Sequence, residues 1–307
     1  MARRTTARRA APARLAPGSA RVRGAIAEQQ RRIALAEARA DAAAEGTIHD
    51  GRVAARRLRS VLKTFRPLLD AGRAQEYRVD LRSFAAALGE VRESDVRRDL
   101  LTAVSLDDGR VSPTAHRRLR ALLEASCATA RETLRRRLAE PAWSELSRRL
   151  RRQRTGRSLL VVRTADLADV LEQVARTWRK PLQILRHEPR SAAELHELRL
   201  ALKHCRYALE TVAGVAPDET ARLLRRLRAA QDRIGDHRDV VLAQHWLHEH
   251  EQTLGAALAG LLLDDLARRE RKLRREGARR AARLPAAWEA WRAATRPVRK
   301  AAKRGRG

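Results

Sequence analysis

The chain has 307 residues, enough for one large domain or two ordinary ones with a hydrophobic core. Its 67 lysines and arginines against 37 aspartates and glutamates give a formal net charge of +30, so its expected partners are polyanions. Its two cysteines match neither a disulfide framework nor a zinc site. No secretory signal and no run of about 18 apolar residues is present, which predicts a cytoplasmic protein without a membrane anchor.

Alanine, leucine, arginine and glutamate dominate, and β-hairpin signals are missing, which predicts an all-α protein. Residues 1–20 and 296–307 are rich in basic residues and are predicted to be disordered arms. The first half is expected to hold helices at 23–45, 49–69, 73–89, 95–104, 113–138 and 142–152. The second half is expected to hold helices at 165–185, 192–212, 218–234, 238–252, 256–283 and 286–295.

One motif occurs twice, 147 residues apart (196 − 49), and both copies read H-x-x-R-x-x-x-[RK]-x-x-R. On a helix the four polar positions fall within roughly 80° of one face and span about 15 Å. The other positions carry apolar side chains on another face, which predicts packing into a core. We call each polar face a cationic rail: the first consists of His49, Arg52, Arg56 and Arg59, and the second of His196, Arg199, Lys203 and Arg206.

Further landmarks recur at nearly the same offset. Residues 88–93 (LGEVRE) precede residues 234–239 (IGDHRD) by 146 positions, and the same offset relates Arg82 to Arg228. Later in each half, a proline interrupts an arginine-rich helix shortly before a tryptophan. The shared order of these landmarks indicates an internal duplication.

The duplication predicts one domain over residues 21–295, built from repeats at about 21–152 and 165–295. Two such helical bundles commonly pack about a pseudo-twofold axis, which would bring the rails to face each other across one basic central channel. Gly89 and Gly235 are expected to cap helix C-termini.

The segments at 49–59, 88–96, 195–210 and 234–239 together resemble the CHAD family, named for a conserved histidine α-helical domain. The resemblance covers about residues 20 to 295. It implies two pseudosymmetric bundles around a basic channel that binds inorganic polyphosphate, and association with polyphosphate granules or polyphosphate enzymes. The sequence lacks the triphosphate-processing CYTH domain that precedes some CHAD regions, so a stand-alone member is expected.

The resemblance implies that the residues of both rails bind polyphosphate. Lys63 continues the first rail, and Arg82 and Arg228 are added through their repeat correspondence. The repeat mate of Lys63 is Glu210 (63 + 147), which predicts a less positive groove at that end. Arginine forks and lysine ammonium groups suit a strand of phosphates that has no bases.

Two other classes of function could use the same basic surface or phosphate chemistry. A nucleic-acid-binding protein would use the same attraction to phosphate, but aromatic residues make up only 3% of the chain, so such binding is expected to be non-specific. A phosphoryl-transfer enzyme would need a Walker-type loop or carboxylates that hold Mg²⁺, and neither pattern is present. The chain is therefore predicted to be non-catalytic and to need no cofactor, and nothing in it identifies a protein partner.

Acids and histidines near the rails have plainer interpretations. The rail arginines could instead pair with nearby acids, namely Glu90, Glu93, Asp236 and Asp239. Three clustered histidines match no zinc motif and are expected to be a solvated helix end without metal: His245, His248 and His250.

Overall fold

The computed structural model describes residues 17–38, 45–104, 112–155, 164–189 and 191–304. Within these ranges the elements are α-helices and short 3-10 turns, with no β-strand, which confirms the predicted all-α class. None of the described helices is long and apolar enough to cross a bilayer.

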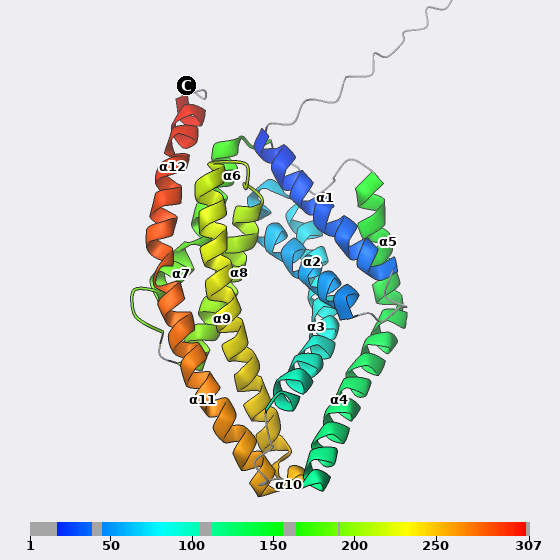
Figure 1. Cartoon of the computed structure of the whole chain (residues 1–307). Coiled ribbons are helices and arrows are strands. Elements are labelled where there is room, and N and C mark those ends of the chain that lie inside the picture. The colour runs from blue at the N-terminus through cyan, green and yellow to red at the C-terminus, as the bar shows by residue number, and fades with distance from the viewer. Residues whose placement is uncertain (1–16, 39–44, 105–111, 156–163, 190, 305–307) are drawn as a thin grey trace, which may run out of the picture.

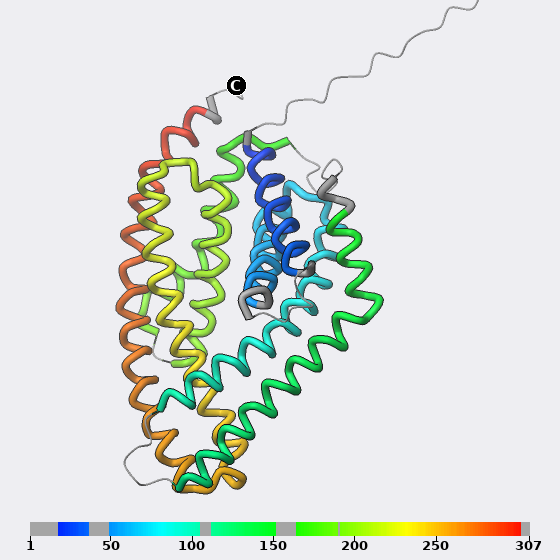
Figure 2. The backbone as a smooth tube through the Cα atoms, turned by 45° about the vertical axis from the view of Figure 1, so that its right-hand side comes forward, coloured from blue at the N-terminus to red at the C-terminus, as the bar shows by residue number. Residues whose placement is uncertain are grey.

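The helices follow each other in two groups (Figure 1). The first group is α1 (Pro17–Ala38), α2 (Glu45–Thr64), η2 (Arg66–Leu68), α3 (Ala71–Thr102), α4 (Pro113–Ala139) and α5 (Pro141–Thr155). The second group is α6 (Leu167–Thr177), α7 (Arg179–Ile184), α8 (Ala192–Glu210), α9 (Pro217–Glu249), α10 (Glu251–Leu254), α11 (Ala256–Ala281) and α12 (Leu284–Arg304). The long helices α4, α9 and α11 converge on the narrow end of the molecule at α10, and α3 ends short of it, as both views show (Figures 1 and 2).

Two predicted helix breaks are wrong. Gly89 and Gly235 do not cap helices but lie inside the continuous helices α3 and α9. A glycine inside a helix costs only about 1 kcal/mol, which the packing of a long helix offsets. At Gly235 a Cβ would stand 3.7 Å from Arg199 Nε, so a side chain larger than methyl would enter the space of that guanidinium.

The helix predicted at 165–185 is divided at Trp178 into α6 and α7. Pro181 has no amide hydrogen, so it cannot donate to the carbonyl of Thr177, four residues earlier. The Cys205 thiol donates to that carbonyl instead, with Sγ 3.1 Å from the oxygen. Cys205 is fully buried, as its place on the apolar side of α8 predicted, and burial raises the pKa of its thiol to about 12.

The ends of the described chain are more helical than predicted. Of the arm predicted at 1–20, residues 1–16 lie outside the described residues, and Pro17 already begins α1. Ser19 Oγ in that helix accepts a hydrogen bond from the backbone amide of Ala165 at 2.7 Å, so the start of α1 is fixed to the second half of the chain. Of the tail predicted at 296–307, residues as far as Arg304 continue α12.

Both hydrophobic cores combine residues from the two halves of the chain. The larger core holds Phe65 of the first half together with Trp178 and Trp291 of the second. A smaller core at the narrow end, which we call the distal core, contains Leu101, Leu119, Leu123, Val240, Ala243, Trp246, Leu247, Leu254, Leu258, Leu262 and Leu266. The two halves therefore fold onto each other instead of packing as separate units.

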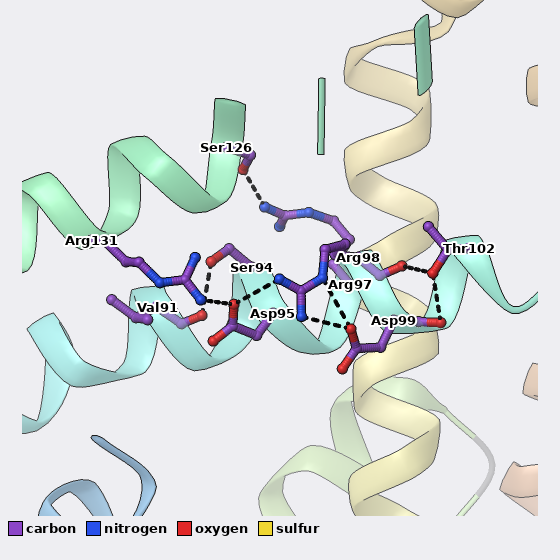
Figure 3. Close-up of polar contacts among 9 residues, drawn as sticks. All are labelled: Val91, Ser94, Asp95, Arg97, Arg98, Asp99, Thr102, Ser126 and Arg131. Atoms are coloured by element: carbon purple, nitrogen blue, oxygen red, sulfur yellow. Dashed lines mark hydrogen bonds and ion pairs between the residues drawn. The ribbon is translucent and has the colours of Figure 1, made fainter. Parts of the chain in front are cut away.

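Polar contacts fix α3 to α4 just above the distal core (Figure 3). Asp95, which is 1% exposed, accepts a hydrogen bond from Arg131 Nη2 at 2.7 Å and lies 3.6 Å from Arg98 Nη1. Arg97 Nη2 donates to Ser126 Oγ at 2.7 Å. Because a buried carboxylate needs such partners, Asp95 stabilises the α3–α4 contact.

Candidate functional site

The two rail helices, α2 and α8, pack against each other. The arginines of the first rail are half-buried on α2, and Arg199, Lys203 and Arg206 are half-buried on α8. His49 and His196, one at the start of each rail, are exposed. The structure thus brings the two copies of the motif together, although they are far apart in sequence.

Four rail cations, two from each helix, form the centre of the site: Arg52, Arg56, Arg199 and Lys203. Among the described residues, no carboxylate lies within 4 Å of their charged nitrogens. The Nε atoms of Arg52 and Arg199 are buried without a hydrogen-bond partner in the described structure. The centre therefore holds crowded cations whose charge the described structure leaves without a direct counter-ion.

Burial and mutual repulsion shift the protonation of this cluster. Removal from water, followed by the neighbouring arginines, lowers the pKa of Arg52 and of Arg199 to about 10. The same causes lower the pKa of Lys203 to about 5, with Arg56 as its strongest charged neighbour. Without a bound anion the Lys203 amine is neutral near pH 7, and an anion beside it would restore its proton.

A cavity of about 270 Å³ opens beside the cluster, lined by residues of α2, α3, α8 and α9. Most of its lining forms pairs related by the offsets of the sequence repeat: Arg52 with Arg199, Arg92 with Arg238, Glu93 with Asp239, and Val96 with Leu242. Arg92 and Arg238 were not among the predicted site residues. Their positions in the 88–93 and 234–239 repeat carried the signal that could have identified them.

The other predicted cations lie nearer the opposite end of the rails. Glu210 lies 3.4 Å from Arg57 Nε, 3.7 Å from Arg206 Nε and 4.0 Å from Arg228 Nη2. Arg206 and Arg228 therefore face a carboxylate of their own. This contact fits the prediction that Glu210 makes the groove less positive at that end.

Lys63 and Arg82 are both exposed. Arg82 on α3 lies close enough to Arg59 to help lower the pKa of the latter, although burial is the larger cause. The pKa of His204 is lowered to about 4, mainly by burial and to a smaller extent by the charge of Lys63. The neutral His204 ring contacts α2 through Ser60, with Nδ1 2.7 Å from Oγ, so this histidine, absent from the prediction, joins the two rail helices.

Three of the four acids named as possible partners of the rails contact other arginines instead. Glu93 receives a hydrogen bond from Arg238 Nη2 at 2.7 Å, and Asp239 lies 3.6 Å from Arg238 Nη1. Asp236 pairs with Arg233 at 3.0 Å. Glu93 and Asp239 still influence the rails from a distance, because their charges partly offset the lowered pKa values of Arg52 and Arg199.

The histidines at the end of α9 form no metal-binding cluster with other described residues. His250 stacks on Trp246 with ring centroids 4.2 Å apart, and its Nδ1 lies 2.9 Å from the Trp246 carbonyl oxygen. His245 and His248 are exposed.

Comparison with known proteins gives the chain its relatives. A family model described as CHAD domain matches residues 24–248. The crystal structure of the CHAD domain from the plant Ricinus communis is 25% identical, with a TM-score of 0.66, and the match covers 94% of this chain and 96% of that chain. PptA from Streptomyces chartreusis shares the fold, with a TM-score of 0.69 at 19% identity, over 88% of this chain and 99% of that chain. A search of curated protein sequences found no match.

Proposed function

The chain belongs to the CHAD family, and on that premise we propose that it binds inorganic polyphosphate between α2 and α8 without converting it. The observation that carries the proposal is the cluster of Arg52, Arg56, Arg199 and Lys203, half-buried and without an ion-paired carboxylate in the described structure. Holding desolvated like charges together costs free energy, which a bound polyanion would offset. Arginine forks and an ammonium group are the donors that phosphate oxygens accept best.

The pairing of the cavity lining supports a duplicated architecture for this site. Each rail helix contributes an equivalent arginine, and each of α3 and α9 contributes another, Arg92 and Arg238. A polyphosphate strand repeats the same unit along its length, so equivalent donors on its two sides meet equivalent oxygens. We infer that the two repeats enclose the basic channel about a pseudo-twofold axis.

Polyphosphate suits the cavity better than nucleic acid does. A volume of about 270 Å³ can enclose part of a bare phosphate strand but not a duplex. Binding of single strands relies on exposed aromatic rings on which bases stack, whereas the aromatic ring that lines this cavity, Trp246, has Arg97 over one face and is stacked with His250. Two of the three acids that line the cavity, Glu93 and Asp239, engage Arg238, which favours binding without Mg²⁺-dependent turnover.

The proposal is tested by the binding of labelled long-chain polyphosphate to the purified protein at about 200 mM salt, where weak phosphate contacts are screened. Duplex DNA and single-stranded RNA are added as competitors at matched charge. We expect both to displace polyphosphate poorly, and we expect the polyphosphate to be recovered with its chain length unchanged. Equal competition by DNA would identify a general polyanion-binding protein, and shortened chains would identify an enzyme.

Polyphosphate binding is expected to tighten as the pH falls from about 8 to about 6. Burial and neighbouring cations lower the pKa of His49 and of His196 in the empty protein; the largest charged contributors are Arg52 and Arg238 respectively. A bound polyanion reverses this repulsion and raises both pKa values, so binding takes up protons and is favoured at lower pH. Titrations of wild type and of a His49→Gln, His196→Gln variant measure the effect, and an affinity of the wild type that is independent of pH would contradict it.

A further inference from the structure

Part of the cavity lining lies outside the repeat pairs, and we call this part the extension. Arg97 of α3 and Trp246 of α9 line this extension, and the exposed His245 and Glu249 form its rim. The repeat offset of 146 maps Arg97 onto Ala243 and Trp246 onto Leu100, neither of which lines the cavity. The extension therefore has no equivalent in the repeat-related lining.

Arg97 is held in place by neutral groups. Its guanidinium carbon lies 5.2 Å from the centroid of the Trp246 ring, and its Nη2 donates to Ser126 Oγ at 2.7 Å (Figure 3). Its Nε is buried without a hydrogen-bond partner, and no described carboxylate lies within 4 Å of its nitrogens. Burial lowers the pKa of Arg97, and the charges of Glu93 and Glu249, which also line the cavity, partly offset that effect from beyond ion-pairing distance. Arg97 is thus an oriented cation of the cavity lining without a direct counter-ion in the described structure.

The extension ends against apolar side chains. Trp246 belongs to the distal core, where Leu101, Leu123 and Leu247 are almost completely buried. A charged phosphate strand cannot continue into such a core, because its desolvation would go uncompensated. A strand that enters from the rails therefore reaches a wall at Trp246.

We propose that this extension binds the terminal phosphate of a polyphosphate chain, with Arg97 as its contact, so that the site recognises chain ends. The proposal rests on the proposed function of the central site. A terminal phosphate differs from the internal ones by one additional ionisable oxygen, and such a group carries close to two negative charges at neutral pH. A guanidinium with several donors and no direct counter-ion is suited to that additional charge.

The test uses short polyphosphate of one defined length in two forms, one with free ends and one whose terminal phosphates are capped as phosphoramidates. Affinities of the full-length protein for both are measured by calorimetry at one salt concentration. We expect wild type to bind the free-ended chain at least about tenfold more tightly, the range of one charge-assisted hydrogen bond. Arg97→Met should lose this preference while keeping its affinity for the capped chain.

The matched control is Arg120→Met, which removes an exposed arginine from α4 and should keep the preference. Equal affinity of wild type for both forms would overturn end recognition while leaving polyphosphate binding intact. An Arg97→Met variant that weakens both forms equally would also overturn it, since Arg97 would then act on the whole strand. Failure of wild type to bind either form would overturn the proposed function itself. Comparing the affinities of wild type for the free-ended and capped chains needs no variant. This comparison therefore tests end recognition even if Arg97→Met does not fold.

Discussion

Replacing Arg52 and Arg199 together by alanine is expected to weaken polyphosphate binding by roughly 100-fold or more. Each guanidinium belongs to a different rail, and both line the same cavity. A hydrogen bond to a charged group contributes about 1.5–3 kcal/mol, so losing one on each side of the strand removes about 3–6 kcal/mol. Direct titration with labelled polyphosphate at about 200 mM salt measures the loss.

A control with two other arginine substitutions distinguishes the loss of these contacts from the loss of net charge. Arg117 and Arg120 are exposed on α4, and replacing both by alanine removes the same two charges away from the cavity. We expect that variant to bind within about twofold of wild type, because exposed charges are screened at this salt concentration. If both double variants lost affinity equally, binding would depend on overall charge and the rails would not form the site.

The rails could be predicted because they are local. Helical periodicity puts their cations on one face of a helix in any tertiary structure. Because the same spacing occurs twice, it is not explained by a chance arrangement of basic residues. The contact between the two rail helices required the fold, since their apolar faces predict burial but do not specify which helix each one packs against. Likewise, the Cys205 thiol donates the hydrogen bond to the Thr177 carbonyl that Pro181 cannot donate. That contact depends on α8 lying against the break between α6 and α7.

The residues that the prediction missed show how much the site depends on tertiary contacts. Arg92 and Arg238 recur in the sequence repeat, so closer use of that repeat would have found them. Arg97 has no basic repeat mate, and its orientation comes from Trp246, which is 149 positions away (246 − 97). His204 lies within the second motif, yet its role follows from Ser60 of the other rail helix.

The two helix ends wrongly predicted at Gly89 and Gly235 share one cause. Glycine was taken as a stop signal at two positions where the flanking residues continue the helix. Gly235 in α9 leaves room for Arg199 of α8, so a contact with another helix explains the glycine at this position. Local propensity does not contain that information, because tertiary packing overrides it.

Replacing Lys203 by methionine is expected to stabilise the empty protein while weakening polyphosphate binding. In the folded state the pKa of Lys203 falls from 10.5 to about 5, so between these values the unfolded chain binds a proton that the folded protein does not. Stability of wild type therefore decreases as the pH falls from about 10 towards 5. Methionine keeps much of the side-chain volume without a titratable group, so the variant should be more stable, by several degrees in Tm at pH 6 and by less at pH 9.

Adding polyphosphate should reverse the order of the two proteins. A ligand that binds only the folded state raises stability with its concentration relative to Kd, and wild type, whose Lys203 regains its proton beside phosphate, has the lower Kd. Lys272→Met, at an exposed position on α11, serves as the control and should leave Tm unchanged in both conditions. A Lys203→Met variant that is less stable than wild type at pH 6 would show that the amine is a structural partner. The rail cluster would then not be held at an energetic cost that only a bound polyanion relieves.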